Sequence, residues 1–354
     1  MAAPGRGTGG RRPTSQDVAT AAGVSRSAVS FAFNDPDRIS AATRERILAV
    51  AEEIGYAPNT LARMLKAGQT RSLGVLLPQS LAKIMENPYY SRFLMGVGQV
   101  CDREGFTLLL TPPVGDSMLK AIPYAGADGF IVCGLENDRG EVAELRRRGV
   151  PFVLVDSDPP EGVPSVDVDD DGGAREVVRH LLQRGHRRLM VLSIDPGPEV
   201  AEHGYRGPLA RRMVGITRSL EEAGLGWDDV RLTEVPCTRM DGYNAVRSLF
   251  HGASPDLRPT AVVALSDVLA IGAVDALRDL GLSIPEEVSV TGYDDLPETS
   301  WMRPRLTTVR QPITAKGRTA ADYLISAIRG EDQHPHQVLG TGLIVRDSTG
   351  PAPE

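Results

Sequence analysis

Four short polar residues stand where buried strands are expected to end. Asp156, Ser266, Asp267 and Asp294 each end or directly follow an apolar run. Carboxylates that converge on a cleft form charge-assisted hydrogen bonds and therefore suit a polyhydroxylated ligand. Each aspartate has an alternative role as a helix cap or turn residue. For Asp267, which precedes a helical pattern, both interpretations stay open.

A second group of polar residues lies near the start of the chain and suits contact with DNA. Arg26 is a natural donor to guanine O6 and N7, and Ser27 can reach either type of base pair. Short hydroxyl and amide groups suit phosphate oxygens. The residues of this kind are Thr14, Ser25, Ser30, Asn34 and Ser40.

The elements that must hold these groups are three short helices. Thr14 and Asp17 have capping-box spacing, and Gly23 stands where a first helix must end. Ser25 is a good cap for a second helix. That layout is typical of a helix-turn-helix whose second helix enters the major groove by its N-terminus. The alternative is a helical hairpin that packs against another surface. A third helix is expected over Ala41–Ile54.

The remaining chain alternates apolar runs with amphipathic stretches. The expected strands are Ser72–Pro78, Phe106–Thr111, Gly129–Gly134, Pro151–Asp156, Arg188–Ser193, Thr260–Ser266 and Val288–Tyr293. The helix-sized segments are Ser91–Glu104, Gly173–Arg184, Ala210–Ala223, Gly242–Phe250 and Asp267–Leu280. Such alternation predicts α/β architecture with doubly wound parallel sheets, which bind ligands beyond the carboxyl ends of their strands. Its length of about 280 residues favours two lobes.

Charge is distributed unevenly along the chain. Residues 1–71 hold ten Lys or Arg and six Asp or Glu, a balance of +4, whereas the whole chain carries −7. The rest therefore carries −11. A basic head on an acidic body indicates that only the head approaches a polyanion, although chance also produces such a fluctuation.

The cysteine pattern and the N-terminus indicate a cytoplasmic, nucleoid-associated protein. Cys101, Cys133 and Cys237 are far apart and odd in number, which does not suit a disulfide framework. No 18-residue apolar run predicts a membrane span. Arg11 and Arg12 are followed by polar residues where an export signal needs an apolar segment. Residues 1–13 are predicted to be a flexible basic tail.

In its motifs the sequence closely resembles the lactose-repressor family of bacterial regulators, from Thr14 to about Gly350. The stretches that carry the resemblance are Asp17-Val-Ala with Ala22-Gly-Val-Ser, Thr43-Arg-Glu-Arg-Ile, Gly55-Tyr-Ala-Pro-Asn-Thr-Leu-Ala-Arg, Ala127-Asp-Gly, Gly185-His-Arg-Arg, Ser289-Val-Thr-Gly-Tyr-Asp-Asp and Leu306-Thr-Thr-Val-Arg-Gln-Pro. The resemblance implies a DNA-binding domain over 14–57, a hinge over 58–71 and a ligand-binding and dimerisation domain over 72–350.

The resemblance further implies that the hinge forms a helix only on the operator, where two copies pair in the minor groove. Asn59, Ala62 and Leu65 are its DNA-binding candidates, and Leu65 matches the leucine that wedges into the central base step. An apolar wedge unstacks that step and bends the duplex. The alternative for Leu65 is a core leucine of an ordinary linker helix. Phe31 departs from the family, which usually has Arg there, so the operator of a relative cannot be assumed.

For the ligand domain, the resemblance implies two lobes like those of periplasmic sugar-binding proteins, joined by three crossovers, with the effector between them. The matching pocket positions hold Asp156, Arg212, Ser266, Asp267 and Asp294. Two departures weaken the case for a sugar. Cys237 replaces the stacking aromatic of some relatives, and the 112–126 segment is about ten residues shorter than is usual in the family. Tyr89 or Trp301 could replace the aromatic platform.

Motifs for other chemistry are incomplete or missing. The run from Asp167 to Gly172 resembles the start of a calcium loop, but Val178 stands where a bidentate glutamate is needed. His251, His334 and His336 lack a fourth partner at ligand spacing. The sequence contains no P-loop, G-x-S-x-G or H-E-x-x-H motif. We therefore expect no metal, no cofactor and no enzyme activity.

Together these features predict a homodimeric repressor of a catabolic operon that reads a pseudo-palindromic operator in double-stranded DNA. A small polar effector, with carbohydrates among the candidates, would control its operator affinity. Within this class, a co-repressor-dependent regulator and an activator with a non-sugar effector remain open. The alternatives from other classes are a solute-binding receptor without DNA function and a Rossmann-type enzyme.

Overall fold

The computed structural model describes residues 13–57, 68–135, 138–197, 200, 204–254, 257–331 and 336–353. The chain divides into two compact units, Met1–Thr70 and Arg71–Glu354. Asn59, Ala62 and Leu65, the candidates on the expected hinge, lie outside the described residues, as do residues 1–12 of the expected basic tail.

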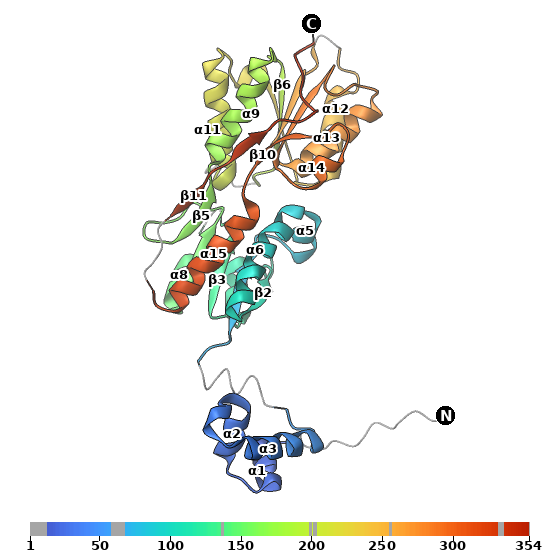
Figure 1. Ribbon diagram of the computed structural model, residues 1–354. Helices are drawn as coiled ribbons and strands as arrows, with labels where there is room; N and C mark the ends of the chain where they lie inside the picture. Colours follow the sequence, from blue (N-terminus) through green and yellow to red (C-terminus); the bar gives the residue numbers. More distant parts are fainter. Residues whose placement is uncertain are drawn as a thin grey trace, which may run out of the picture. The chain divides into compact units, whose positions relative to one another are not determined.

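The first unit is a three-helix head (Figure 1). Its helices are α1 (Ser15–Ala22), α2 (Arg26–Asn34) and α3 (Ala41–Glu53), with a short 3-10 turn η1 (Pro36–Arg38). The small apolar core consists of Val18, Ala19, Ala22, Val29, Ala32, Ile47 and Ala51. Gly23 ends α1 with φ of 61°, in the left-handed region that glycine adopts at little cost. The helix-turn-helix predicted from the sequence is present.

The second unit contains two lobes, each built on a six-stranded sheet. The first-lobe sheet has the order β11-β5-β4-β3-β1-β2 and is parallel throughout. Its strands are β1 (Ser72–Leu76), β2 (Thr107–Thr111), β3 (Gly129–Cys133), β4 (Phe152–Val155), β5 (Ser165–Val168) and β11 (Gln337–Leu339). The first-lobe helices are α5 (Leu81–Glu86), α6 (Pro88–Glu104), α7 (Met118–Ala121), α8 (Glu141–Arg147) and α15 (Ile313–Ile328), with the 3-10 turn η2 (Ile122–Tyr124).

The second-lobe sheet has the order β12-β10-β9-β8-β6-β7, and only β12 runs antiparallel to its neighbour. Its strands are β6 (Leu189–Ile194), β7 (Val230–Val235), β8 (Ala261–Ala264), β9 (Ser289–Asp294), β10 (Thr307–Arg310) and β12 (Gly342–Ile344). The second-lobe helices are α9 (Asp170–Gln183), α11 (Gly207–Glu222), α12 (Arg239–Phe250), α13 (Asp267–Asp279) and α14 (Glu298–Trp301), with the 3-10 turn η3 (Trp227–Asp229).

Helices cover both faces of each sheet, so the strands are apolar on both sides, as expected for parallel sheets. In the first lobe, α6 and α15 pack on one face and the segment from α7 to α8 packs on the other. In the second lobe, α9 and α11 cover one face and α12 and α13 the other. Figure 1 shows the two layered lobes and the labelled helices on them.

The chain passes between the lobes three times. The crossovers lie between β5 and α9, between β10 and α15, and between β11 and β12. This arrangement of two doubly wound lobes and three crossovers is the architecture predicted from the sequence. It brings the carboxyl ends of the strands of both sheets toward one inter-lobe region, where polar side chains from both lobes and from a crossover meet.

Candidate functional site

In the head, three of the predicted phosphate contacts are helix caps. The Asp17 carboxylate accepts from the backbone N–H and the hydroxyl of Thr14, both at 2.7 Å. The Ser25 hydroxyl accepts from the Ala28 N–H at 3.1 Å, and the Ser40 hydroxyl accepts from Thr43 at 3.3 Å. A serine oxygen that accepts a backbone bond keeps its own O–H to donate. Ser25 therefore retains a donor at the N-terminus of α2, where the helix dipole favours an anion.

The outward face of α2 carries the predicted base-reading residues. Arg26 and Ser27 occupy its first turn and are exposed. The Arg26 Nε donates to the Ser15 hydroxyl at 3.2 Å, and its terminal nitrogens make no hydrogen bond with the described residues. Asn34, one turn beyond Ser30, donates its Nδ2 to the Ser30 carbonyl at 3.0 Å. This arrangement leaves a guanidinium fork available at the leading end of the helix.

Phe31, the departure from the family pattern, packs locally. The Arg38 guanidinium lies 5.3 Å from the centre of its ring, and Arg38 also pairs with Asp35 at 3.0 Å. A cation over an aromatic face is a stabilising arrangement. The ring is only half-buried, so one side of it stays available for contact with another molecule.

In the second unit, the strand-end residues lie where the sequence placed them. Asp156 directly follows β4, Ser266 caps α13 just beyond β8, and Asp294 is the last residue of β9. Asp156 has φ of 53° and Asp294 has φ of 131°, which non-glycine residues rarely adopt. Strained backbone of this kind persists only where the surroundings enforce it, and it clusters at functional sites.

A buried lysine is at the centre of the first-lobe side of this region. Lys316, on the first turn of α15, is 1% exposed. Its ammonium donates to Asp156 Oδ1 at 2.7 Å, to the Tyr89 hydroxyl at 2.8 Å and to Gln311 Oε1 at 3.1 Å. The Tyr89 hydroxyl in turn donates to Asp156. Burial alone would raise the pKa of Asp156, but the ammonium of Lys316 outweighs it and lowers that pKa.

Gln311 continues this network into the second lobe. Its Nε2 donates to Asp294 Oδ1 at 2.5 Å, and the Ser266 hydroxyl donates to Asp294 Oδ2 at 3.3 Å. A chain of hydrogen bonds therefore runs from Asp156 through Lys316 and Gln311 to Asp294, across the crossover between β10 and α15. Burial raises the pKa of Asp294 to about 6. We call Asp156, Lys316, Gln311, Asp294, Ser266 and Tyr89 the cleft network.

Arg212 lies beside the cleft network on the second-lobe helix α11. Its Nε donates to Asp170 Oδ1 at 2.9 Å and its Nη1 donates to the Leu265 carbonyl at 2.8 Å. The guanidinium lies 3.8 Å from the centre of the Tyr293 ring. Burial would lower the pKa of Arg212, but the carboxylate of Asp170 raises it, so the side chain stays charged. A fixed, charged donor of this kind can orient a hydroxyl-bearing ligand.

Asp267 and Trp301 differ in their relation to the cleft network, because the Asp267 backbone N–H donates to the Asp294 carboxylate whereas Trp301 makes no such contact among the described residues. Asp267 is fully buried, and its two carboxylate oxygens accept from the Leu296 N–H at 2.7 Å and from the Thr308 hydroxyl at 2.5 Å. These bonds give Asp267 a structural role that ties α13 to two neighbouring segments. Trp301 is 71% exposed at the end of α14. Of the two proposed aromatic platforms, only Tyr89 is part of the cleft network.

Cys237, the second departure from the family pattern, faces Asn87 of the first lobe. The Asn87 Nδ2 donates to the Cys237 Sγ at 3.9 Å, which is a direct contact between the lobes. Asn87 also caps α6 by accepting from the Tyr89 N–H at 3.0 Å. Burial raises the pKa of the Cys237 thiol to about 11, so the group is a neutral thiol near pH 7.

Sequence reasoning missed Lys316, Gln311, Asp170 and Asn87. Gln311 lies in the Leu306-Thr-Thr-Val-Arg-Gln-Pro stretch that carried the family resemblance, so the resemblance could have pointed to it. Lys316 offered a different signal, because it is one lysine in the apolar helical pattern that begins at Ile313. A lysine on an otherwise apolar face needs a buried counter-charge, and Asp156 provides it.

A second ionic cluster, which shares Asp170 with Arg212, also joins the lobes. Arg211 of α11 pairs with Asp158 at 3.1 Å, Asp167 at 3.1 Å and Asp170 at 3.3 Å. Asp158 and Asp167 belong to the first lobe, and Asp158 also accepts from the Gly207 N–H at 2.9 Å. Burial, followed by the nearby charge of Asp156, raises the pKa of Asp167 to about 6 despite Arg211.

We expect Asp167→Asn to stabilise the protein near neutral pH. The folded-state pKa of Asp167 lies above its ordinary value of 3.8, so the folded state binds this proton more tightly than the unfolded chain does. The stability that comes from this tighter proton binding is therefore fully present below pH 4, and the folded state loses it as the pH rises through 6. The substitution should raise the free energy of unfolding at pH 7.5 by up to about 3 kcal/mol, and by roughly half as much at pH 5.

Thermal unfolding of both proteins at the two pH values tests this expectation. Asp347→Asn, in an exposed pair with Arg305, is the matched control and should give no gain at either pH. A loss of stability in Asp167→Asn at pH 7.5 would show that the ion pair with Arg211 outweighs burial.

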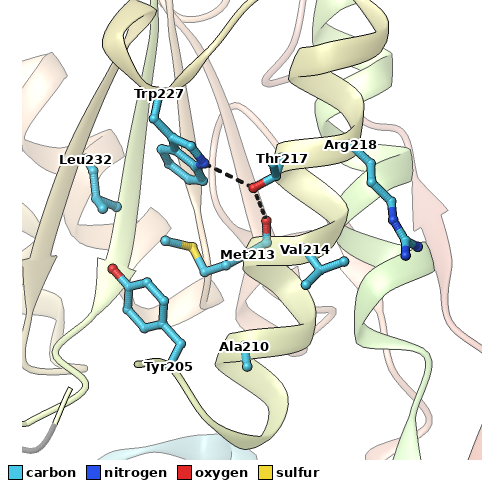
Figure 2. Close-up of a pocket in the computed structure, with 8 residues that line it drawn as sticks. All are labelled: Tyr205, Ala210, Met213, Val214, Thr217, Arg218, Trp227 and Leu232. Carbon is cyan, nitrogen blue, oxygen red and sulfur yellow. Dashed lines mark hydrogen bonds between the residues drawn. The ribbon is translucent and has the colours of Figure 1, made fainter. Parts of the chain in front are cut away.

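A separate pocket of about 660 Å³ lies on the second lobe between α11 and β7 (Figure 2). Apolar groups dominate its lining, and its polar groups are already paired. The Trp227 indole donates to Thr217 at 3.0 Å, and the Tyr205 hydroxyl donates to Glu234 at 2.6 Å. A polyhydroxylated ligand would find few partners here. None of the predicted effector residues lines this pocket.

The histidines and the acidic residues of the described part of the chain were candidates for metal binding. Among those residues, no group of three or more His, Cys, Asp or Glu side chains is placed to hold a metal ion. His180 and His186 are buried and donate or accept hydrogen bonds with Thr349 at 2.9 Å and Thr260 at 2.9 Å, respectively. Among the described helices, none is both long enough and apolar enough to cross a bilayer.

Comparison with known protein families matches both parts of the chain. Residues 14–59 match the family "Bacterial regulatory proteins, lacI family", and residues 178–349 match the periplasmic binding protein-like domain. The HTH-type transcriptional regulator CelR of Thermobifida fusca is 34% identical over 350 residues, which cover 96% of this chain and 98% of CelR.

Two solved structures share the fold across nearly the whole chain. The structure of the lac repressor dimer bound to operator and the anti-inducer ONPF has a TM-score of 0.80 at 26% identity, covering 96% of this chain and 100% of that one. The CelR–cellobiose complex has a TM-score of 0.68 at 32% identity, covering 95% and 100%. This chain belongs to the LacI family of bacterial regulatory proteins, a family of DNA-binding transcriptional regulators.

Proposed function

We propose that the protein is a homodimeric repressor of a catabolic operon, and that a small sugar-like effector bound between the lobes controls its operator affinity. The observation that carries the effector site is the cleft network, in which charged and polar groups of both lobes meet at a crossover. The CelR–cellobiose complex supports a sugar as the effector, because it is a similar protein with a sugar bound. The lac repressor dimer on its operator supports dimeric DNA binding.

In this proposal, the head reads one half-site through the first turn of α2. Arg26 and Ser27 contact base edges, and Thr14, Ser25, Ser30, Asn34 and Ser40 contact phosphates. Two heads in a dimer then match a pseudo-palindrome. Asn59, Ala62 and Leu65 would belong to a hinge over 58–71 that becomes helical on the operator, where Leu65 wedges into the central step. The 14–57 and 72–350 regions keep their separate roles in DNA binding and ligand binding.

Effector binding would change the spacing of the lobes. A ligand hydroxyl that replaces one bond of the cleft network makes different contacts in open and closed arrangements, and this differential affinity is what shifts a population. Operator binding happens in the cytoplasm, where we place the protein. We also expect that the purified protein leaves a bound sugar chemically unchanged, and detection of a product by mass spectrometry would contradict this.

Reciprocal coupling between sugar and operator tests the proposal. Isothermal titration would measure binding of cellobiose, maltose and trehalose to the full-length protein, with and without a duplex that the protein selects from a random pool. If a sugar lowers operator affinity, the operator must lower affinity for that sugar by the same factor. Equal sugar affinities in both titrations would remove the switch. Tighter sugar binding in the presence of operator would indicate a co-repressor.

A further inference from the structure

Carboxylates outnumber cations around the cleft network. Lys316 pairs with Asp156, and Asp170 is shared by Arg212 and Arg211. Arg211 also pairs with Asp158 and Asp167, and Asp294 lies beside the carboxylate of Asp267. Lys316 uses all three ammonium hydrogens on Asp156, Tyr89 and Gln311, at 2.7, 2.8 and 3.1 Å. An ammonium has three donors and no acceptor. Lys316 therefore has no donor left for a negatively charged ligand.

Arg212 is also paired within the protein. Its ion pair with Asp170 measures 2.9 Å, and the Asp170 side chain is fully buried. A buried carboxylate cannot give up its counter-ion without a large desolvation cost. Arg212 can still donate hydrogen bonds to a neutral ligand, but its charge is already matched.

The remaining carboxylate of the cleft network, Asp294, has only neutral hydrogen-bond donors. Gln311, Ser266 and the Asp267 backbone N–H donate to it, and it forms no ion pair with the described residues, while Arg212 and Lys316 act on it only through longer-range charge interaction. Asp294 is 5% exposed and faces the same region as Lys316 and Arg212. A phosphate or carboxylate brought into this region would be desolvated, would find no unpaired cation and would be repelled by Asp294.

We propose that the cleft accepts an uncharged polyhydroxyl effector, and that the Asp156–Lys316 ion pair causes it to reject phosphorylated and acidic sugars. This inference rests on the proposed effector function of the cleft and specifies the ligand class. Neutral hydroxyls can both donate to Asp294 and accept from Arg212 without any charge to compensate. The proposal distinguishes a regulator that senses a free sugar from one that senses a phosphorylated sugar.

Matched pairs of neutral and anionic sugars test the selectivity directly. The pairs are cellobiose with cellobionate, trehalose with trehalose 6-phosphate and glucose with glucose 6-phosphate, each titrated into the full-length protein by calorimetry. For every neutral sugar that binds, its anionic partner should bind at least about tenfold more weakly. An anionic sugar that binds as tightly as its neutral parent, or more tightly, would overturn the proposal.

Asp156→Asn provides the sharper test, because it should leave Lys316 as an unpaired cation in the cleft. The amide keeps the size of the side chain and leaves the Lys316 ammonium without a counter-charge. The affinity ratio of neutral to anionic sugar should then fall by at least about tenfold. The double variant Asp156→Asn/Lys316→Met removes both charges and should reject anions again. Asp347→Asn, which removes a carboxylate from an exposed surface pair, is the control and should keep the parental ratio.

Operator binding and circular dichroism confirm that each variant is folded. If Asp156→Asn does not fold, the matched pairs on the unaltered protein decide the question alone. An unchanged ratio in folded Asp156→Asn would show that the ion pair does not set the selectivity. If no sugar of either kind binds at millimolar concentration, the sugar effector itself fails, and this inference fails with it. A tight anionic sugar leaves the effector function standing and overturns only the inference.

Discussion

Arg212→Met is expected to lower the free energy of unfolding by about 3–5 kcal/mol, the usual cost of breaking a buried ion pair from one side. The substitution removes the partner at 2.9 Å from the fully buried Asp170 and leaves it with Arg211 at 3.3 Å, so the cost should fall toward the lower end of that range. It also removes a charged donor from the proposed effector cleft. Because hydrogen bonds from charged groups contribute about 1.5–3 kcal/mol, effector affinity should fall at least about tenfold. Chemical denaturation and sugar titration measure the two effects separately.

Arg305→Met is the matched control for this substitution. It also removes an arginine from an ion pair, but the pair with Asp347 is exposed, and such pairs contribute at most about 1 kcal/mol. An Arg212→Met protein that unfolds like the control and still releases its operator in response to sugar would show that Arg212 is neither a structural nor an effector residue.

Arg26→Ala is expected to weaken binding to the preferred operator by about 1–3 kcal/mol and to relax base preference at one position in each half-site. The reason is that the Arg26 terminal nitrogens are free of hydrogen bonds to the described residues and lie at the leading end of α2. Binding to a set of operators that differ at single positions measures both effects.

Arg38→Ala is the control for base reading. The Arg38 guanidinium pairs with Asp35 and covers Phe31, so its loss should leave base preference unchanged. If Arg26→Ala instead weakened binding to every sequence equally, Arg26 would be a phosphate contact and another residue would read that base.

The sequence predicted the head more completely than the cleft. The start and end of α1 and α2 depend on local signals, namely the Thr14–Asp17 capping box, Gly23 and the Ser25 cap, and the structure contains all of them. Local signals of this kind need no knowledge of distant contacts.

The strands predicted from the sequence are the buried, apolar ones. β5 reads Ser-Val-Asp-Val and β7 reads Val-Arg-Leu-Thr-Glu-Val, so polar residues interrupt both. β7 lies at the edge of its sheet, where one side stays exposed and a continuous apolar run is not required. The short strands β11 and β12 carry too few residues for periodicity to mark them.

In the cleft, the rule that ligands bind beyond strand ends located Asp156, Ser266 and Asp294. It could not locate Lys316, which lies in α15 just after the crossover into the first lobe. Lys316 donates to Asp156, which lies 160 positions earlier in the sequence. The same rule did not separate Asp267 from its neighbours, because its two structural bonds come from Leu296 and Thr308 on other segments. Pairings between distant segments are set by the tertiary fold.

Selection of bound duplexes from a random pool by the full-length protein, followed by measurement of binding to the winner across salt concentrations, tests the central claim most directly. We predict a pseudo-palindromic winner whose binding constant falls steeply as salt rises, since each phosphate contact releases counter-ions. The same selection would be repeated with the neutral sugars present. Failure to enrich any sequence in either condition, or a winner without two-fold symmetry, would contradict the account of a dimeric, operator-reading regulator.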